Sequence, residues 1–209
     1  MLKECNEHGF FRADKCPLCQ SEGKFLMSDR EHDALSRIMA GVLRHFPEKF
    51  SLKMNEHGWV DLYAFIDSVR KFPGFKWLKP HHIKAIVETD PKGRYQLQNN
   101  KLRATYGHTI NLELDLPTEN IPKFLYYPAT EEECEIILET GIKPVDRKKV
   151  HLSKTKELAL EAGKSRVEKP IILEVDAEKA CKDGIIIKQA GKTVYIADEV
   201  PGKYLRKAE

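Results

Sequence analysis

The sequence lacks a long apolar run. No stretch of about 18 consecutive residues is apolar, so we expect no membrane-spanning helix. The first residues also lack the apolar segment of a secretory signal, so we expect a cytoplasmic protein. Neither sign of charge dominates, because 35 Lys and Arg stand against 32 Asp and Glu in 209 residues. This balance excludes a chain that is basic throughout.

The sequence has only five cysteines, and they are too unevenly placed for a disulfide framework. Three of them lie in the first 19 residues together with His8, whereas Cys134 and Cys181 stand alone in apolar segments. Such clustering is typical of a metal site in a reducing compartment.

Charge is distributed unevenly along the chain. Residues 25–110 contain 14 Lys and Arg, 9 Asp and Glu, and six of the eight His. Residues 111–209 contain 17 basic and 19 acidic side chains. The middle of the chain is therefore the better candidate for binding a polyanion, although scatter in composition produces similar imbalances.

The first segment carries two ligand pairs, each with two residues between its members. Cys5 and His8 form one pair, and Cys16 and Cys19 form the other. Each pair can hold one ion from a tight turn, and together they suit a tetrahedral, structural zinc site. The segment is too short to bury a core, so a metal is expected to stabilise it. The alternatives are a disordered tail with chance cysteines, or a site in which water or another side chain replaces His8.

The next segment has the pattern of three helices and a hairpin. Ser28 and Glu31 form a capping box ahead of the first helix. A second helix is expected after Asp61 and a third around Lys79–Glu88. Two strands flank Asn99-Asn100, which is a hairpin signal. Together with the basic charge, this order favours a winged-helix lobe, a fold that often binds nucleic acid.

After Pro117 the pattern becomes rich in strands. A helix over Thr130–Glu139 has Thr130 as N-cap and Glu133 at the capping-box position, and Gly141 closes it. Strands are expected at Phe124–Tyr127, Val150–Ser153, Pro170–Val175, Ile185–Ile187 and Val194–Ile196. The sequence therefore predicts an α+β fold.

Several separated segments follow one another in a characteristic order. They are Leu35-Ser36 with Val42-Leu43-Arg44-His45, Gly58-Trp59-Val60, Arg103-Ala104-Thr105-Tyr106-Gly107-His108-Thr109, Val150-His151-Leu152-Ser153, Arg166 ahead of Pro170, Gly191-Lys192-Thr193-Val194-Tyr195-Ile196, and Val200-Pro201 with Tyr204-Leu205. Together they resemble the RNA 2′-phosphotransferases, NAD-dependent enzymes known for the last step of fungal-type tRNA splicing. The resemblance covers nearly everything after the first segment.

The resemblance implies two lobes, a winged-helix RNA-binding lobe over residues 25–115 and an ADP-ribosyltransferase-like, β-rich NAD-binding lobe over 116–209. The zinc-binding module that the ligand pairs predict, over residues 1–24, is an addition to them. The resemblance also implies NAD as co-substrate and, as partner, an RNA that bears a 2′-phosphate, as in tRNA. The products would be RNA with a 2′-hydroxyl, ADP-ribose 1″,2″-cyclic phosphate and nicotinamide. We expect a monomer.

The resemblance places the family's three arginines and one histidine on Arg44, His45, Arg103 and Arg166. The arginines would clamp the 2′-phosphate, because a planar guanidinium holds two oxygens and stays charged. His45 would contact the phosphate and assist proton movement at the ribose hydroxyl. Taken singly, each residue has an ordinary interpretation as a surface charge, a core histidine or a cross-strand pair. The sequence around Arg166 departs from the family's Arg-His-Gly-x-Pro, so Lys164 and Arg147 remain alternatives.

For NAD, the resemblance points to four residues, Tyr127, Thr130, His151 and Ser153. A strand that ends beside a helix N-cap offers backbone N–H groups to phosphates, and His151 can contact the nicotinamide ribose. The family's Tyr-His-Gly-Thr is replaced here by Tyr127-Pro128-Ala129-Thr130. Because Pro128 has no N–H and cannot replace an imidazole, the sequence predicts weaker or different NAD contacts at this strand.

Two other interpretations remain open. A non-catalytic nucleic-acid-binding protein would combine the zinc module and winged helix with a degenerate NAD lobe; Pro128 favours this and the retained Arg/His set opposes it. An ADP-ribosyltransferase that stops after the first step would leave an ADP-ribosylated RNA. A measurement of NAD binding tests the former, and the identity of the product tests the latter.

Overall fold

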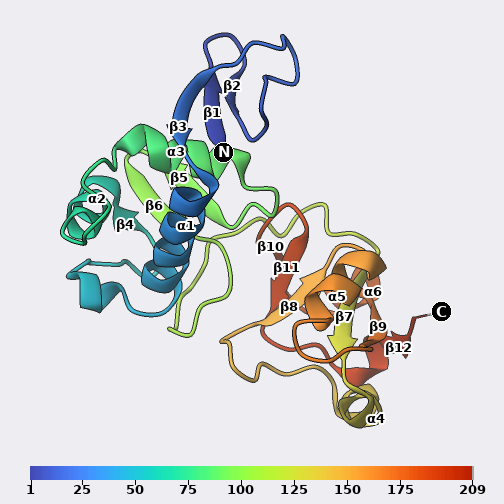
Figure 1. Ribbon diagram of the computed structural model, residues 1–209. Coiled ribbons are helices and arrows are strands. Elements are labelled where there is room, and N and C mark those ends of the chain that lie inside the picture. Colours follow the sequence, from blue (N-terminus) through green and yellow to red (C-terminus); the bar gives the residue numbers. More distant parts are fainter. Residues whose placement is uncertain (209) are drawn as a thin grey trace. The chain divides into compact units, whose positions relative to one another are not determined.

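The computed structural model describes residues 1–208 and divides the chain into two compact units. Unit 1 comprises Met1–Thr105 with Leu112–Leu114. Unit 2 comprises Tyr106–Asn111 and the chain from Asp115 onward (Figure 1). No helix of the described residues is both long enough and apolar enough to cross a membrane.

Unit 1 begins with a small antiparallel sheet that the sequence did not predict. Its strands are β1 (Leu2–Cys5), β2 (Gly9–Phe11) and β3 (Lys24–Met27), in the order β2-β1-β3. Leu2 pairs with Met27, and both side chains are fully buried in the same apolar cluster as the helices of this unit. The N-terminal segment is therefore packed into the core of unit 1.

Three helices follow, as predicted. They are α1 (Asp29–Arg44), α2 (Leu62–Arg70) and α3 (Pro80–Thr89), with a 3-10 turn η1 (Pro47–Phe50) after the first. The Ser28–Glu31 capping box is present, and Asp61 caps α2 by accepting from the N–H of Ala64 at 2.8 Å. The buried faces of these helices share one core with strands of this unit.

A second antiparallel sheet completes unit 1. Its strands are β4 (Val60–Asp61), β5 (Tyr95–Gln98) and β6 (Lys101–Ala104), in the order β4-β6-β5. Asn99 and Asn100 have φ of 48° and 58°, the left-handed values that a two-residue hairpin turn requires. The predicted hairpin is confirmed, and it places Gln96 directly opposite Arg103.

Unit 2 contains a six-stranded antiparallel sheet. Its strands are β7 (Phe124–Ala129), β8 (Val150–Ser153), β9 (Ile171–Asp176), β10 (Ile187–Gln189), β11 (Val194–Ala197) and β12 (Leu205–Lys207). Their order is β10-β11-β8-β7-β9-β12. The strand expected at Ile185–Ile187 was placed wrongly, since β10 begins only at Ile187, whose register partner is Ala197.

Helices lie on both faces of this sheet. They are α4 (Glu131–Thr140), α5 (Lys156–Gly163) and α6 (Ala177–Lys182), and the turn η2 (Gly202–Tyr204) precedes β12. Thr130, Glu133 and Gly141 cap α4 as predicted. Helix α5 meets the side chain of Pro128, whereas Cys134 of α4 packs with Ala129. Since adjacent strand residues point to opposite sides, we call the two sides the α5 face and the α4 face. The mixture of helices and strands that the sequence predicted is confirmed.

Candidate functional site

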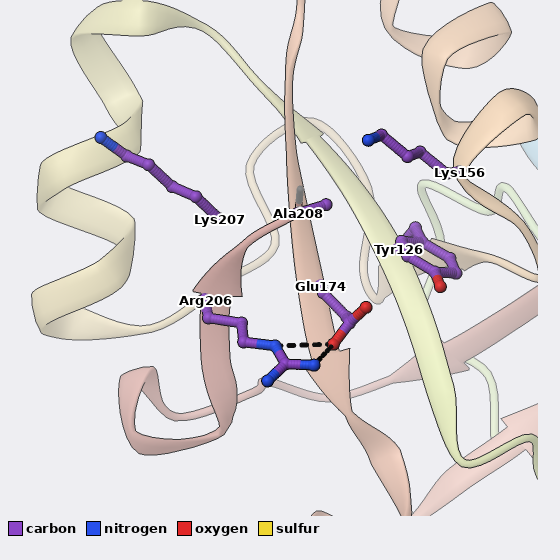
Figure 2. A pocket seen from close by; sticks show the side chains of 6 residues that line it. All are labelled: Tyr126, Lys156, Glu174, Arg206, Lys207 and Ala208. Carbon is purple, nitrogen blue, oxygen red and sulfur yellow. Dashed lines mark hydrogen bonds and ion pairs between the residues drawn. The ribbon is translucent and has the colours of Figure 1, made fainter.

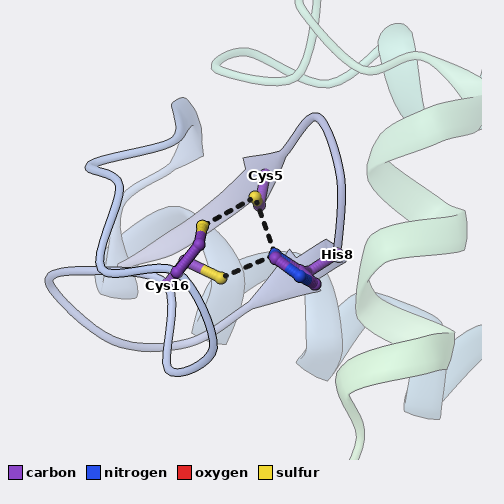
Figure 3. A group of neighbouring side chains, drawn as sticks. Cys5, His8 and Cys16 are labelled. Carbon is purple, nitrogen blue, oxygen red and sulfur yellow. Dashed lines mark hydrogen bonds between the residues drawn. The ribbon is translucent and has the colours of Figure 1, made fainter.

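Four side chains of the N-terminal segment converge as a possible metal site. The ligand atoms of Cys5, His8, Cys16 and Cys19 all lie within 4.8 Å of one another. Figure 3 shows His8 Nδ1 between two thiols, 3.5 Å from Cys5 Sγ and 3.6 Å from Cys16 Sγ. Cys5 comes from the end of β1, and His8 from the turn that leads to β2.

These spacings match the edges of a zinc tetrahedron. With Zn–S bonds of about 2.3 Å and a Zn–N bond of about 2.0–2.1 Å, tetrahedral geometry separates ligand atoms by roughly 3.6–3.8 Å. The observed separations are 3.5 and 3.6 Å for the S–N pairs and 3.6 Å for Cys5 Sγ to Cys19 Sγ. Three of the six separations thus match a tetrahedral ion, and all six are within 4.8 Å, so the four side chains could hold one metal ion.

Ser21 supports this cluster from outside. Its Oγ lies 3.2 Å from Cys19 Sγ and 3.6 Å from Cys5 Sγ. Hydrogen bonding with Ser21 is the main cause that lowers the pKa of Cys5 to about 6, and it also lowers the pKa of Cys19. Thiolates are the form of cysteine that binds metals, so Ser21 favours the ligating state of both side chains.

Arg44 and His45 lie at the C-terminal end of α1. Arg44 is the last residue of the helix, and His45 is its C-cap. A cation is favourable there, because the helix dipole is negative at this end. Burial raises the pKa of the Tyr95 hydroxyl, and the nearby charge of Arg44 opposes that rise. Arg44 is thus close to β5, the strand beside that of Arg103.

Arg103 is buried on β6, with only 3% of its surface exposed. Its Nε donates to Gln96 Oε1 at 2.8 Å, and its Nη1 donates to the carbonyl of His57 at 3.0 Å. The guanidinium also lies over the Trp59 ring, 4.2 Å from the centroid. Three contacts on different sides therefore fix the plane of this guanidinium, which is the preorganisation that a phosphate clamp requires.

In unit 2, His151 and Ser153 lie on the α5 face. Ser153 pairs with Tyr126, which lies two residues from Pro128 on the same side of β7. His151 Nε2 accepts from the N–H of Gly107 at 3.1 Å, so its Nδ1 carries the proton when the ring is neutral. The ring of Tyr106 meets His151 edge-on at 5.9 Å between centroids.

A row of polar side chains continues from Ser153 across the sheet. Tyr126, Glu174 and Arg206 occupy matching register positions on β7, β9 and β12. Arg206 Nε donates to Glu174 Oε1 at 2.7 Å, as Figure 2 shows. Burial, with the Glu174 charge, raises the pKa of the Tyr126 hydroxyl and keeps it a donor. A cavity of about 280 Å³ is lined by Tyr126, Lys156, Glu174, Arg206, Lys207 and Ala208.

Tyr127, Thr130 and Arg166 form a separate group on the α4 face. Arg166 Nη2 donates to Glu133 Oε1 at 2.7 Å. Glu133 also accepts from the N–H of Thr130, so one carboxylate joins Arg166 to the start of α4. The hydrogen bond to Glu133 raises the pKa of Arg166, which keeps it charged. The structure therefore places the Tyr127 side chain on the opposite face from His151 and Ser153.

Pro128 is accommodated by close packing against α5. A Cβ built on Gly163 would lie 2.7 Å from the Cβ atoms of both Pro128 and Pro170, closer than any side chain tolerates. Pro128 pairs in register with Ile172 of β9, whereas the pairing of β7 with β8 includes only Tyr126. Strand β7 therefore contains the proline and keeps its register with β9.

The structure thus groups the predicted residues in four places. The metal ligands converge, and Arg44, His45 and Arg103 belong to neighbouring elements of unit 1. His151 and Ser153 share one face of the sheet in unit 2, and Tyr127, Thr130 and Arg166 lie on the other. Sequence reasoning missed Gln96 as a partner of Arg103, Tyr126 as a partner of Ser153 and Glu133 as a partner of Arg166. Arg147, considered as an alternative to Arg166, instead donates to the Gly107 carbonyl at 2.7 Å, beside His151.

Comparison with known proteins gives a consistent result. Residues 29–199 match the family described as "RNA 2′-phosphotransferase, Tpt1 / KptA family". The chain is 42% identical over 205 residues to a "Probable RNA 2′-phosphotransferase" of Methanosarcina acetivorans, which covers 98% of both chains. It is 43% identical over 206 residues to "Probable RNA 2′-phosphotransferase 1" of Archaeoglobus fulgidus, or 99% of this chain and 94% of that one. A "Probable RNA 2′-phosphotransferase" of Thermoplasma acidophilum is 40% identical to the chain over 209 residues.

Proposed function

The chain belongs to the RNA 2′-phosphotransferase, Tpt1 / KptA family, and from this we propose that it removes an internal 2′-phosphate from RNA by transferring it to NAD. The observation that carries the proposal, beside family membership, is the rigid placement of Arg103. A buried guanidinium held by Gln96, the His57 carbonyl and Trp59 is built for an anion of fixed geometry.

The proposed reaction has two steps. An oxygen of the RNA 2′-phosphate first attacks the ribose carbon of NAD that bears nicotinamide, and nicotinamide leaves with the bonding electrons. The neighbouring 2″-hydroxyl then attacks the phosphorus and loses its proton. The RNA 2′-oxygen leaves and takes up a proton, giving RNA with a 2′-hydroxyl and ADP-ribose 1″,2″-cyclic phosphate.

Charge builds on the phosphate oxygens in the second step, so fixed cationic donors are the main way to accelerate it. We assign this role to Arg44, Arg103 and Arg166. Their charge is permanent, and a planar guanidinium can hold two oxygens. His45 is assigned to the proton transfers, because imidazole is the side chain that best exchanges protons near neutral pH.

For NAD we propose contacts from Tyr127, Thr130, His151 and Ser153. His151 and Ser153 act from the α5 face, where Tyr126 joins them. Thr130 is the N-cap of α4, at the positive end of the helix dipole, which favours a phosphate. Tyr127 contributes through its backbone, since its side chain lies on the α4 face. Pro128 stands where the family has a histidine, and it packs against Gly163 of α5. This packing supports the view that β7 retains its backbone course without the histidine.

We propose that Cys5, His8, Cys16 and Cys19 hold a structural zinc, which would tie the loops of residues 1–24 together. The other parts are a winged-helix RNA-binding lobe over 25–115 and an ADP-ribosyltransferase-like lobe over 116–209. The helix-helix-helix-hairpin order of unit 1 and the antiparallel sheet of unit 2 support these assignments. We further propose a cytoplasmic monomer that acts on tRNA-like RNA.

The test is a product assay on a short RNA with one internal 2′-phosphate, with and without NAD. We expect NAD-dependent loss of the phosphate, and Arg103→Ala is expected to reduce the rate by at least about a hundredfold, as removal of one charge-stabilising donor does. Absence of turnover together with absence of NAD binding by calorimetry would instead support a non-catalytic nucleic-acid-binding protein. Accumulation of an ADP-ribosylated RNA would indicate an enzyme that stops after the first step.

A further inference from the structure

Unit 1 contains a second polar cavity next to Trp59. Its volume is about 270 Å³, and it is lined by Lys53, Met54, Asn55, Trp59, Val60, Asp61 and Lys101. The residues come from the segment before β4, from β4 itself and from the start of β6. Asp61 of β4 pairs with Lys101 of β6. Apart from Trp59, whose ring helps to hold Arg103, none of these residues has a role in the reaction proposed above.

Trp59 lines this cavity, and its ring also contacts the Arg103 guanidinium. Arg103 itself does not line the cavity. The backbone of Trp59 is fixed on both sides. Its N–H donates to Asn55 Oδ1 at 2.8 Å, and its carbonyl accepts from the N–H of Asn55 at 3.0 Å. The cavity is therefore lined by a tryptophan whose backbone is held in place and whose ring contacts a predicted catalytic arginine.

The polar side chains around the ring suit a nucleotide. Lys53 and Lys101 are exposed cations. Asp61 is engaged as the N-cap of α2, so part of its charge is already neutralised by the helix. Asn55 uses its Oδ1 for two backbone N–H groups, which leaves its amide N–H₂ as the group that can donate to a base. Aromatic stacking flanked by cations is the usual way to bind unpaired RNA.

We propose that this cavity binds one unpaired nucleotide of the RNA adjacent to the 2′-phosphorylated residue. The base stacks on Trp59, and Lys53 and Lys101 contact the backbone phosphates on either side. The cavity is slightly smaller than the usual range for ligand sites, which suits one nucleotide and not a duplex. The proposal rests on the proposed function, because Arg103 defines where the 2′-phosphate lies.

Trp59 fluorescence tests the proposal without any turnover. In a Trp77→Phe background Trp59 is the only tryptophan, so quenching by RNA reports on this ring alone. The probe is an adenosine hexanucleotide with one internal 2′-phosphate, titrated in the absence of NAD at several salt concentrations. The test variant carries Lys53→Ala and Lys101→Ala. The matched control carries Lys71→Ala and Lys76→Ala, two exposed lysines of the same unit that do not line the cavity.

We expect the RNA to quench Trp59 in the background protein and in the control. In the test variant, the slope of log K against log salt should be shallower by about 1.4, the value for two lost contacts to single-stranded phosphates. No quenching at saturating RNA, or equal slopes in test and control variants, would overturn the proposal. The product assay is run in parallel: normal turnover without quenching refutes only the nucleotide site, whereas quenching without turnover refutes only the proposed function.

Discussion

Gln96 is predicted to be a positioning residue for Arg103. Its Oε1 accepts from Arg103 Nε at 2.8 Å, and Gln96 lies directly opposite Arg103 in the hairpin. Gln96→Ala removes this bond but leaves the His57 carbonyl and the Trp59 ring in place. A hydrogen bond to a charged group contributes about 1.5–3 kcal/mol. With the other two contacts retained, we expect a loss of about 1–2 kcal/mol, which corresponds to a fall in kcat of roughly 5- to 30-fold.

The matched control for this prediction is Gln98→Ala. Gln98 lies two residues along the same strand, is exposed, and faces Lys101. Steady-state removal of the 2′-phosphate from a short RNA gives kcat and KM for both variants, and thermal unfolding verifies that both are folded. We expect kcat to fall for Gln96→Ala alone, with little change in KM. Equal kcat values for the two variants, in an enzyme that Arg103→Ala inactivates, would refute the reasoning.

Two further predictions concern unit 1. Loss of the metal should destabilise the unit, so a chelator is expected to release about one zinc per chain and to lower the Tm, and Cys16→Ser is expected to lower the Tm as well. Cys181→Ser is the control. An unchanged Tm in Cys16→Ser would contradict the metal site. Acid should also destabilise the unit, because burial lowers the pKa of His82 to about 4 and its Nδ1 accepts the N–H of Lys79 only when neutral. The pKa is below the unfolded value, so this stability is present above about pH 6.5 and is lost as the pH falls towards 4, about 3 kcal/mol in total. His82→Phe should flatten the dependence of the unfolding free energy on pH in this window, and an unaltered slope would show that other groups cause it.

Local signals in the sequence predicted local structure well. The capping residues around α1 and α4 and the asparagine pair of the hairpin act through contacts within a few residues, so they are visible in the sequence. The same hairpin would also have predicted Gln96 as the partner of Arg103, because a two-residue turn at Asn99-Asn100 fixes the register.

The remaining features depend on contacts between distant segments. The order of strands in unit 2 is not the order of the chain, so nothing local shows that Ser153 pairs with Tyr126. For the same reason, the sequence could not show that Tyr127 faces away from His151. Helices α5 and α6 were missed because they are short and depend on packing against the sheet for their stability. The cavity at Trp59 is lined by both Lys53 and Lys101, which are far apart in the sequence, so no local pattern could predict it.

The burial of Leu2, Leu26 and Met27 in the core of unit 1 affects how the N-terminal segment can be studied. Removing residues 1–24 would strip β1 from β3 and expose to water an apolar surface that α1 and α3 otherwise share. A truncated protein is therefore expected to aggregate or to lose activity even if these residues never touch RNA. Point substitutions of exposed residues of the segment, such as Leu18, leave the core intact. They therefore separate a role of the segment in RNA recognition from its role in keeping the protein soluble.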